Sequence, residues 1–276
     1  MRGILAKVSR VVLLFSGVPM PQAFKSDAEI ITDAMKFARQ NCTRIANELV
    51  NLAVYPSEER PWTVLMAGSP GAGKTEVSKG FEAALEELPS EGFEGLGKVL
   101  RIDPDDFRVY FPDYNGRNSS LFHSGVIKIV ERVVDRAFAK NVSFILDGTL
   151  SSDAVAKRNI ERSLRRERDV TLLYVYQDPL RAWQFVQSRE AVEGRNIPLQ
   201  VFVAQYFSCR RTVKAMKLLH GPSIRVDLLI QARDGQGQPT VLEDVTAAAI
   251  DAAIPDTYSE EQLLQRLSRG GGDDDE

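Results

Sequence analysis

The chain has 276 residues, a formal net charge of −3 and a pI near 5.7. Because it has no overall basic field, a nucleic-acid partner is not expected. No apolar run approaches the about 18 residues that a membrane span requires. The two cysteines, Cys42 and Cys209, make no disulfide framework and suit a reducing compartment. These features predict a cytoplasmic protein without a membrane partner.

The first clear helix begins at Ser26, which with Glu29 forms a capping-box pattern. Residues 1–25 form an N-terminal arm in this interpretation, and the acidic, glycine-rich end of the chain, residues 269–276, is expected to be a disordered tail. No internal repeat is visible between them. The sequence therefore predicts one domain over residues 26–268.

Strand-like and helix-like runs alternate through this domain. An α/β fold is predicted, with a parallel sheet of about five strands that helices cover on both faces. The expected strands are 62–67, 99–103, 142–148, 170–176 and 224–230. The expected helices begin with the one at Ser26 and continue near 75–87, 122–139, 153–167, 179–192 and 198–218.

A phosphate-binding loop is predicted between the strand at 62–67 and the following helix. The segment fits G-x-x-x-x-G-K-[ST], and its glycines allow the backbone to aim N–H groups at phosphate oxygens. Lys74 would reach the β- and γ-phosphates, and the Thr75 hydroxyl would hold Mg²⁺. ATP or GTP, together with Mg²⁺, is thus the expected ligand of Gly68, Ser69, Pro70, Gly71, Ala72, Gly73, Lys74 and Thr75.

Two of the predicted strands end in acidic residues. Asp147 lies at the end of one strand and resembles the acid that positions Mg²⁺ in P-loop proteins. Alternatively, it caps the next helix. Asp103, Asp105 and Asp106 follow another strand. One of these carboxylates would accept the proton of an attacking hydroxyl. Alternatively, the segment is a β-turn or helix N-cap whose acidic residues have no catalytic role. Because alternate residues after a strand share a side, Asp103 and Asp105 are the candidates.

Arginines near residue 190 are candidates for stabilising a transferred phosphoryl group. Arg189 and Arg195 would diverge on a continuous helix, but Gly194 can end the helix and let Arg195 fold back as part of a lid. They could equally be exposed helix-end residues. The basic run from Lys157 to Arg168 is interleaved with acids and is interpreted as a solvated helix face.

With these residues in place, the chain resembles the zeta-toxin family of small-molecule kinases, best known for phosphorylating UDP-N-acetylglucosamine. The resemblance spans about residues 27–235. It consists, in family order, of a leading helix, the phosphate loop, an I-D-x-D-x-F-[RK] segment, a P-x-[YF] turn, an acid-Gly-Thr strand end and two spaced arginines. It implies a P-loop kinase domain and an ATP-dependent phosphotransferase with a nucleotide sugar as acceptor.

The resemblance also implies roles for single residues. It makes Asp105 the catalytic base and places Lys74, Arg189 and Arg195 around the phosphoryl group. Three places differ from the family pattern: Phe111 precedes the proline of the turn, Ser151 replaces a substrate-contacting arginine, and the late loop of residues 232–235 lacks the usual asparagine. Substrate-binding roles are implied for Asp103, Glu131, Asp147 and Thr149.

The expected partners follow from the same resemblance. A toxin of this kind would be restrained by an antitoxin protein, or by the N-terminal segment of its own chain. Two alternatives stay open: a P-loop kinase of another small alcohol (an antibiotic, a nucleoside or a dinucleotide cofactor), and a nucleotide-gated interaction protein in which Asp105 would be dispensable.

Overall fold

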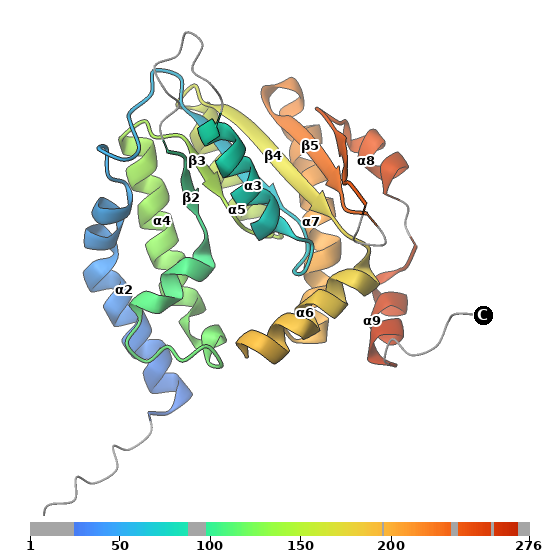
Figure 1. Ribbon diagram of the computed structural model, residues 1–276, viewed down its shortest axis with the longest axis horizontal. Helices are drawn as coiled ribbons and strands as arrows, with labels where there is room; N and C mark the ends of the chain where they lie inside the picture. Colours follow the sequence, from blue (N-terminus) through green and yellow to red (C-terminus); the bar gives the residue numbers. More distant parts are fainter. Residues whose placement is uncertain (1–24, 88–97, 195, 233–236, 255–256, 270–276) are drawn as a thin grey trace, which may run out of the picture.

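A sheet lies at the centre of the computed structural model, which describes residues 25–87, 98–194, 196–232, 237–254 and 257–269 (Figure 1). Within these residues the sheet has six strands in the order β2-β3-β1-β4-β5-β6. The first five strands of the chain pair in parallel, and β6 pairs antiparallel with β5. The predicted P-loop kinase-like α/β fold is confirmed, with one strand more than expected. The strands are β1 (Trp62–Ala67), β2 (Leu100–Ile102), β3 (Phe144–Leu146), β4 (Asp169–Tyr176), β5 (Arg225–Ile230) and β6 (Thr240–Leu242).

The helices predicted from the sequence correspond to α2 to α7. The elements β6, α8 and α9, which are short and lie after the last predicted strand, were not predicted. The helices are α2 (Asp27–Leu49), α3 (Lys74–Glu87), α4 (His123–Ala139), α5 (Asp153–Leu164), α6 (Pro179–Glu193), α7 (Leu199–His220), α8 (Ala247–Ala253) and α9 (Glu260–Ser268). Short 3₁₀ helices are η1 (Pro104–Tyr110), η2 (Ser119–Phe122) and η3 (Gly221–Ser223).

Alternation along the strands gives the sheet two apolar faces. In β1, Val64 and Met66 pack against α3 on one face, while Leu65 and Ala67 pack with α5 and α7 on the other. Residues of β2 and β3 share a core with α4 and α2. Figure 1 shows α3 in front of the sheet and α5 and α7 behind it. The expected coverage of both faces is confirmed.

The start of α2 has the predicted capping box. The Ser26 hydroxyl accepts the backbone N–H of Glu29 at 3.3 Å, and the Glu29 carboxylate accepts the N–H of Ser26 at 2.8 Å. The predictions for residues 1–24 and 270–276, an arm and a disordered tail, lie outside the described residues. None of the described helices is long and apolar enough to cross a bilayer.

Arg168 corrects the interpretation of the basic run as a solvated face. Helix α5 ends at Leu164, and Arg168 lies in the turn before β4 with only 3% of its surface exposed. Its guanidinium donates to the carbonyl oxygens of Trp62 and Val142, both at 2.7 Å, and to the Thr63 hydroxyl at 2.8 Å. Burial lowers the Arg168 pKa to about 10, so the side chain stays charged at neutral pH. Its contacts join the starts of β1, β3 and β4.

We expect Arg168→Ala to lower the free energy of unfolding by about 3 kcal/mol, because two buried carbonyls and a hydroxyl lose their donor. Arg165→Ala is the matched control, since that side chain is 66% exposed; its effect should stay within about 0.5 kcal/mol. Urea denaturation of both variants measures the difference. Equal losses would contradict the role assigned to Arg168.

Candidate active site

The phosphate-loop motif, residues 68–75, begins at the carboxyl end of β1 and runs into the first residues of α3. Gly71 and Gly73 have φ of +73° and +83°, a region that residues with side chains rarely adopt. A Cβ on Gly71 would lie 2.1 Å from the carbonyl oxygen of Ala182 in α6. The loop therefore holds its shape only with glycine at this position, and its backbone lies directly against α6.

Lys74 and Thr75 begin α3, so the loop ends at a helix N-terminus. The Lys74 amine folds back over the loop and donates to the carbonyl oxygen of Ser69 at 2.7 Å. A cation held above a glycine-lined loop at the start of a helix is the arrangement that binds phosphate oxygens. These residues fit the phosphates of a nucleotide.

Asp147 lies beside this loop because β3 pairs with β1. The carboxylate is buried, and its Oδ2 atom accepts the Ser78 hydroxyl of α3 at 2.8 Å and Nη1 of Arg101 at 3.3 Å. Burial, followed by the nearby Asp103 carboxylate, raises the Asp147 pKa. The sequence-based placement of an acid next to the phosphate loop is thus correct. Ser78, which joins the two, was not singled out from the sequence.

Acidic residues after β2 form a compact turn rather than an extended loop. Asp103 caps η1, and its Oδ1 atom accepts the Asp105 N–H at 2.9 Å. Asp105 pairs with Arg108, whereas Asp106 pairs with Arg101 at 3.0 Å. The expectation that Asp103 and Asp105 share a side by strand-like alternation is wrong. In a 3₁₀ helix the neighbours are three residues apart, so Asp105 faces Arg108.

Arg101 contacts Asp103, Asp106 and Asp147, and sequence reasoning missed it. Burial lowers the Arg101 pKa, but these carboxylates more than offset that effect and the pKa is raised. A usable signal was present in the sequence: Arg101 and Asp103 are two residues apart around a buried strand, which places them on one face.

Helix α6 ends at Gly194, which has a left-handed φ of +72°, as predicted. A Cβ on Gly194 would lie 2.9 Å from Cγ of Arg117, so this end of α6 touches the segment between η1 and η2. Arg189 is exposed on α6. Arg195 lies outside the described residues, and the convergence of the two arginines stays a prediction.

The two remaining predicted substrate contacts lie in different surroundings. Thr149 is next to the phosphate loop: its carbonyl oxygen accepts the Gly68 N–H at 3.2 Å, and its hydroxyl is 2.9 Å from that of Ser151. Glu131 of α4 instead pairs with Arg158 of α5 at 3.0 Å, at the surface. Its predicted role with substrate therefore requires it to leave this ion pair.

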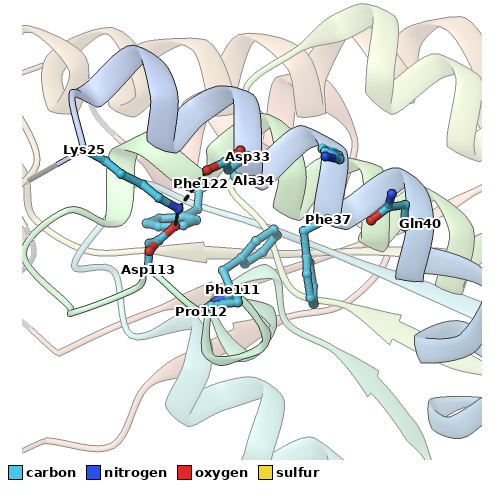
Figure 2. Close-up of a pocket in the computed structure, with 10 residues that line it drawn as sticks. Lys25, Asp33, Ala34, Phe37, Gln40, Phe111, Pro112, Asp113 and Phe122 are labelled. Carbon is cyan, nitrogen blue, oxygen red and sulfur yellow. Dashed lines mark hydrogen bonds and ion pairs between the residues drawn. The ribbon is translucent and has the colours of Figure 1, made fainter. Parts of the chain in front are cut away.

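A pocket of about 230 Å³ lies between α2 and the turn that continues from η1 (Figure 2). Phe111 forms its floor, with ring centroids 5.2 Å from those of both Phe37 and Phe122. Lys25 closes one side through ion pairs to Asp33 at 2.7 Å and Asp113 at 2.8 Å. Phe111 departs from the family pattern, and here its ring is buried in an aromatic cluster.

Among the described residues, no group of three or more histidine, cysteine, aspartate or glutamate side chains could hold a metal ion.

Solved structures with the same fold include two from multi-protein systems. A structure from the PezAT chromosomal toxin–antitoxin system of Streptococcus pneumoniae matches with a TM-score of 0.61 and 18% identity, over 85% of this chain and 94% of that one. The AvrRxo1-ORF1:AvrRxo1-ORF2 complex with ATP matches with a TM-score of 0.53 and 16% identity, over 86% of this chain and 75% of that one. At these identities the likeness shows the fold. A comparison with curated proteins found no significant match.

The family model named zeta toxin matches residues 45–238. This range includes the phosphate loop, both acidic strand ends, and helix α6. Combined with the P-loop kinase-like fold, the match identifies a kinase-type phosphotransferase. The chain belongs to the zeta toxin family.

Proposed function

We propose that this protein transfers the γ-phosphoryl group of ATP to a hydroxyl of a nucleotide sugar, UDP-N-acetylglucosamine, and acts as a toxin in the cytoplasm. The observation that carries the proposal is the meeting of two elements at one edge of the sheet. The phosphate-loop helix contacts Asp147 through Ser78, and Asp147 is joined through Arg101 and Asp103 to the acidic turn that contains Asp105. The acceptor identity comes from the family resemblance.

Lys74 and the loop backbone would bind the β- and γ-phosphates. Mg²⁺, when bound, would neutralise phosphate charge, and Thr75 and Asp147 would hold it directly or through water. Ser78 and Arg101 both donate to the Oδ2 atom of the buried Asp147. Oδ1 is then the oxygen that would face the ion. Arg189 and Arg195 would approach the transferred group from the end of α6.

In the transfer step the acceptor oxygen attacks the γ-phosphorus, the bond from that phosphorus to the β–γ bridging oxygen breaks, and ADP leaves. The hydroxyl proton passes to Asp105 as general base. The acceptor hydroxyl must compete with Arg108 for this carboxylate, since the two side chains are paired in the free protein. Asp103 would orient Asp105 through the hydrogen bond to its backbone N–H.

An antitoxin protein is the partner we propose. The matching structures come from the PezAT toxin–antitoxin system and from a two-protein AvrRxo1 complex. A chain that consumes a wall precursor would need such restraint. The alternative source of restraint is the N-terminal segment of the same chain, which lies outside the described residues.

Two observations favour a second acceptor class. Glu131, a predicted substrate contact, is engaged by Arg158, and Ser151 stands where the family has a substrate-contacting arginine. A changed acceptor pocket would suit a kinase of another small alcohol with the same loop and base. Incubation with ATP, Mg²⁺ and a panel of UDP-sugars, nucleosides and aminoglycosides distinguishes the two classes by the phosphorylated product.

Lys74→Ala should reduce phosphoryl transfer at least about 100-fold, because the amine neutralises charge that develops on the phosphates. Lys79→Ala, an exposed lysine of the same helix, is the control and should keep wild-type activity. Product formation is measured by release of ADP together with mass spectrometry of the acceptor. Full activity in a folded Lys74→Ala protein would remove the ATP-kinase proposal.

Asp105→Asn should lower the turnover number by about 10²–10⁴-fold while ATP affinity stays near wild type, because asparagine keeps the shape but accepts no proton. Asp106→Asn tests the neighbouring acid, whose side chain is 61% exposed, and should lower the turnover number much less. Steady-state kinetics and nucleotide titration give the two quantities. A reversed order would show that another carboxylate is the base.

Expression of the wild-type chain should slow bacterial growth, and Lys74→Ala should relieve the effect, because toxicity on this proposal requires phosphoryl transfer. Growth curves after induction, at matched protein levels, measure this. Equal toxicity of the two chains would point to a cause other than catalysis and would contradict the toxin proposal.

A further inference from the structure

Arg101 lies inside the site but directly precedes the I-D-x-D-x-F-[RK] segment, which begins at Ile102. It is the middle residue of β2, and its side chain is only 10% exposed. Leu100 and Ile102 point to the core with α4, so Arg101 points to the opposite face, where α3 packs. A charge buried this far must have partners of opposite charge.

The partners of Arg101 come from three separate segments. Its Nη1 atom is 2.8 Å from Asp103 at the start of the η1 turn and 3.3 Å from Asp147 at the end of β3. Its Nε atom is 3.7 Å from Glu82 of α3. A fourth carboxylate, that of Asp106, accepts from Nη2 at 3.0 Å. One guanidinium therefore joins the phosphate-loop helix, the β3 end and the acidic turn.

Both oxygens of Asp103 are used in this arrangement. Oδ2 accepts from Arg101, and Oδ1 accepts the backbone N–H of Asp105. The position of the Asp105 backbone is thereby tied to Arg101 through one intervening side chain. Asp147 is tied in turn to α3 through Ser78. Asp103 and Asp147 are 7% and 4% exposed, so without Arg101 these two buried carboxylates would repel each other.

We propose that Arg101 is a positioning residue for phosphoryl transfer, which holds the acidic turn and therefore Asp105 at a set place relative to the phosphate loop. The inference rests on the proposed function for its kinetic consequence, but the positioning itself is a property of the free protein. Arg101 touches neither nucleotide nor acceptor in this role. A displacement of the base by about 1 Å would cost roughly 100-fold in rate.

Arginine is specifically suited to this place. Its planar fork presents donors in several directions at once, whereas lysine offers one compact charge. Here Nη1, Nη2 and Nε each face a different carboxylate or pair of carboxylates. Lysine would preserve the charge balance of the buried acids but not all of these contacts, so Arg101→Lys should retain part of the function.

The kinetic test compares Arg101→Met and Arg101→Lys with Arg225→Met. Arg225 of β5 also pairs with two carboxylates, those of Asp227 and Glu243, but lies at the start of its strand, away from the phosphate loop. We expect Arg101→Met to lower kcat about 100-fold with the KM for ATP changed less than about threefold. Arg101→Lys should lower kcat about tenfold, and Arg225→Met should keep wild-type kcat.

A second readout does not require activity. Amide hydrogen exchange of residues 103–110 should become at least about tenfold faster in Arg101→Met, while exchange in β1 and β4 stays unchanged. If Arg101→Met does not fold, the same two measurements on Arg101→Lys decide. Either wild-type kcat or unchanged exchange of residues 103–110 in the folded variant would overturn the inference, as would a uniform rise in exchange over the whole sheet, which indicates a purely structural role.

The failure of this inference is distinguishable from failure of the proposed function. If the wild-type chain phosphorylates no acceptor of the panel, the proposed function fails, and hydrogen exchange alone then decides whether Arg101 orders the acidic turn. If the wild-type chain is active and Arg101→Met is equally active, only the role of Arg101 fails.

Discussion

The parallel pairing of β1 with β3 on one side and β4 on the other is the constraint on which the site depends. Parallel strands end at the same edge, so the segments that follow them meet there. The phosphate loop follows β1, Asp147 follows β3, and the acidic turn follows β2, which is next to β3. Gly68 and Asp147, 79 positions apart in the chain, are brought to the same edge of the sheet by strand order.

Two buried arginines, Arg168 and Arg101, lie near opposite ends of the strands and have different electrostatic surroundings. At the starts of the strands, Arg168 is surrounded by carbonyl and hydroxyl oxygens, which satisfy hydrogen bonds but carry no full charge. Burial there lowers the Arg168 pKa. At the other edge, Arg101 is surrounded by carboxylates and its pKa is raised. The first arrangement joins strands into a sheet, and the second keeps mutually repelling acids close together.

The chemistry and the acceptor are supported to different extents by the arrangement of the site. The groups proposed for phosphoryl transfer lie along the carboxyl ends of β1, β2 and β3. The groups predicted to contact the acceptor are less uniform: Thr149 adjoins the phosphate loop, whereas Glu131 is held by Arg158. Phe111 fills an aromatic cluster beside the turn that follows Asp105. The departures of Phe111 and Ser151 from the expected family pattern thus both fall on the side predicted to contact the acceptor.

The sequence by itself determined the order of five strands and six helices along the chain. It also determined the phosphate loop, the helix end at Gly194 and the presence of acids at two strand ends. These are local features, because periodicity, capping residues and glycine positions act within a few residues of the chain. Only the tertiary structure decided that Arg168 is buried, that Asp105 faces Arg108, and that Arg101 joins three segments. Those outcomes depend on contacts such as that between Arg168 and Thr63, 105 positions apart in the chain. A local pattern does not contain the charge or shape of a partner so distant in sequence, so burial and pairing of the charged residues were settled by the packing of strands and helices.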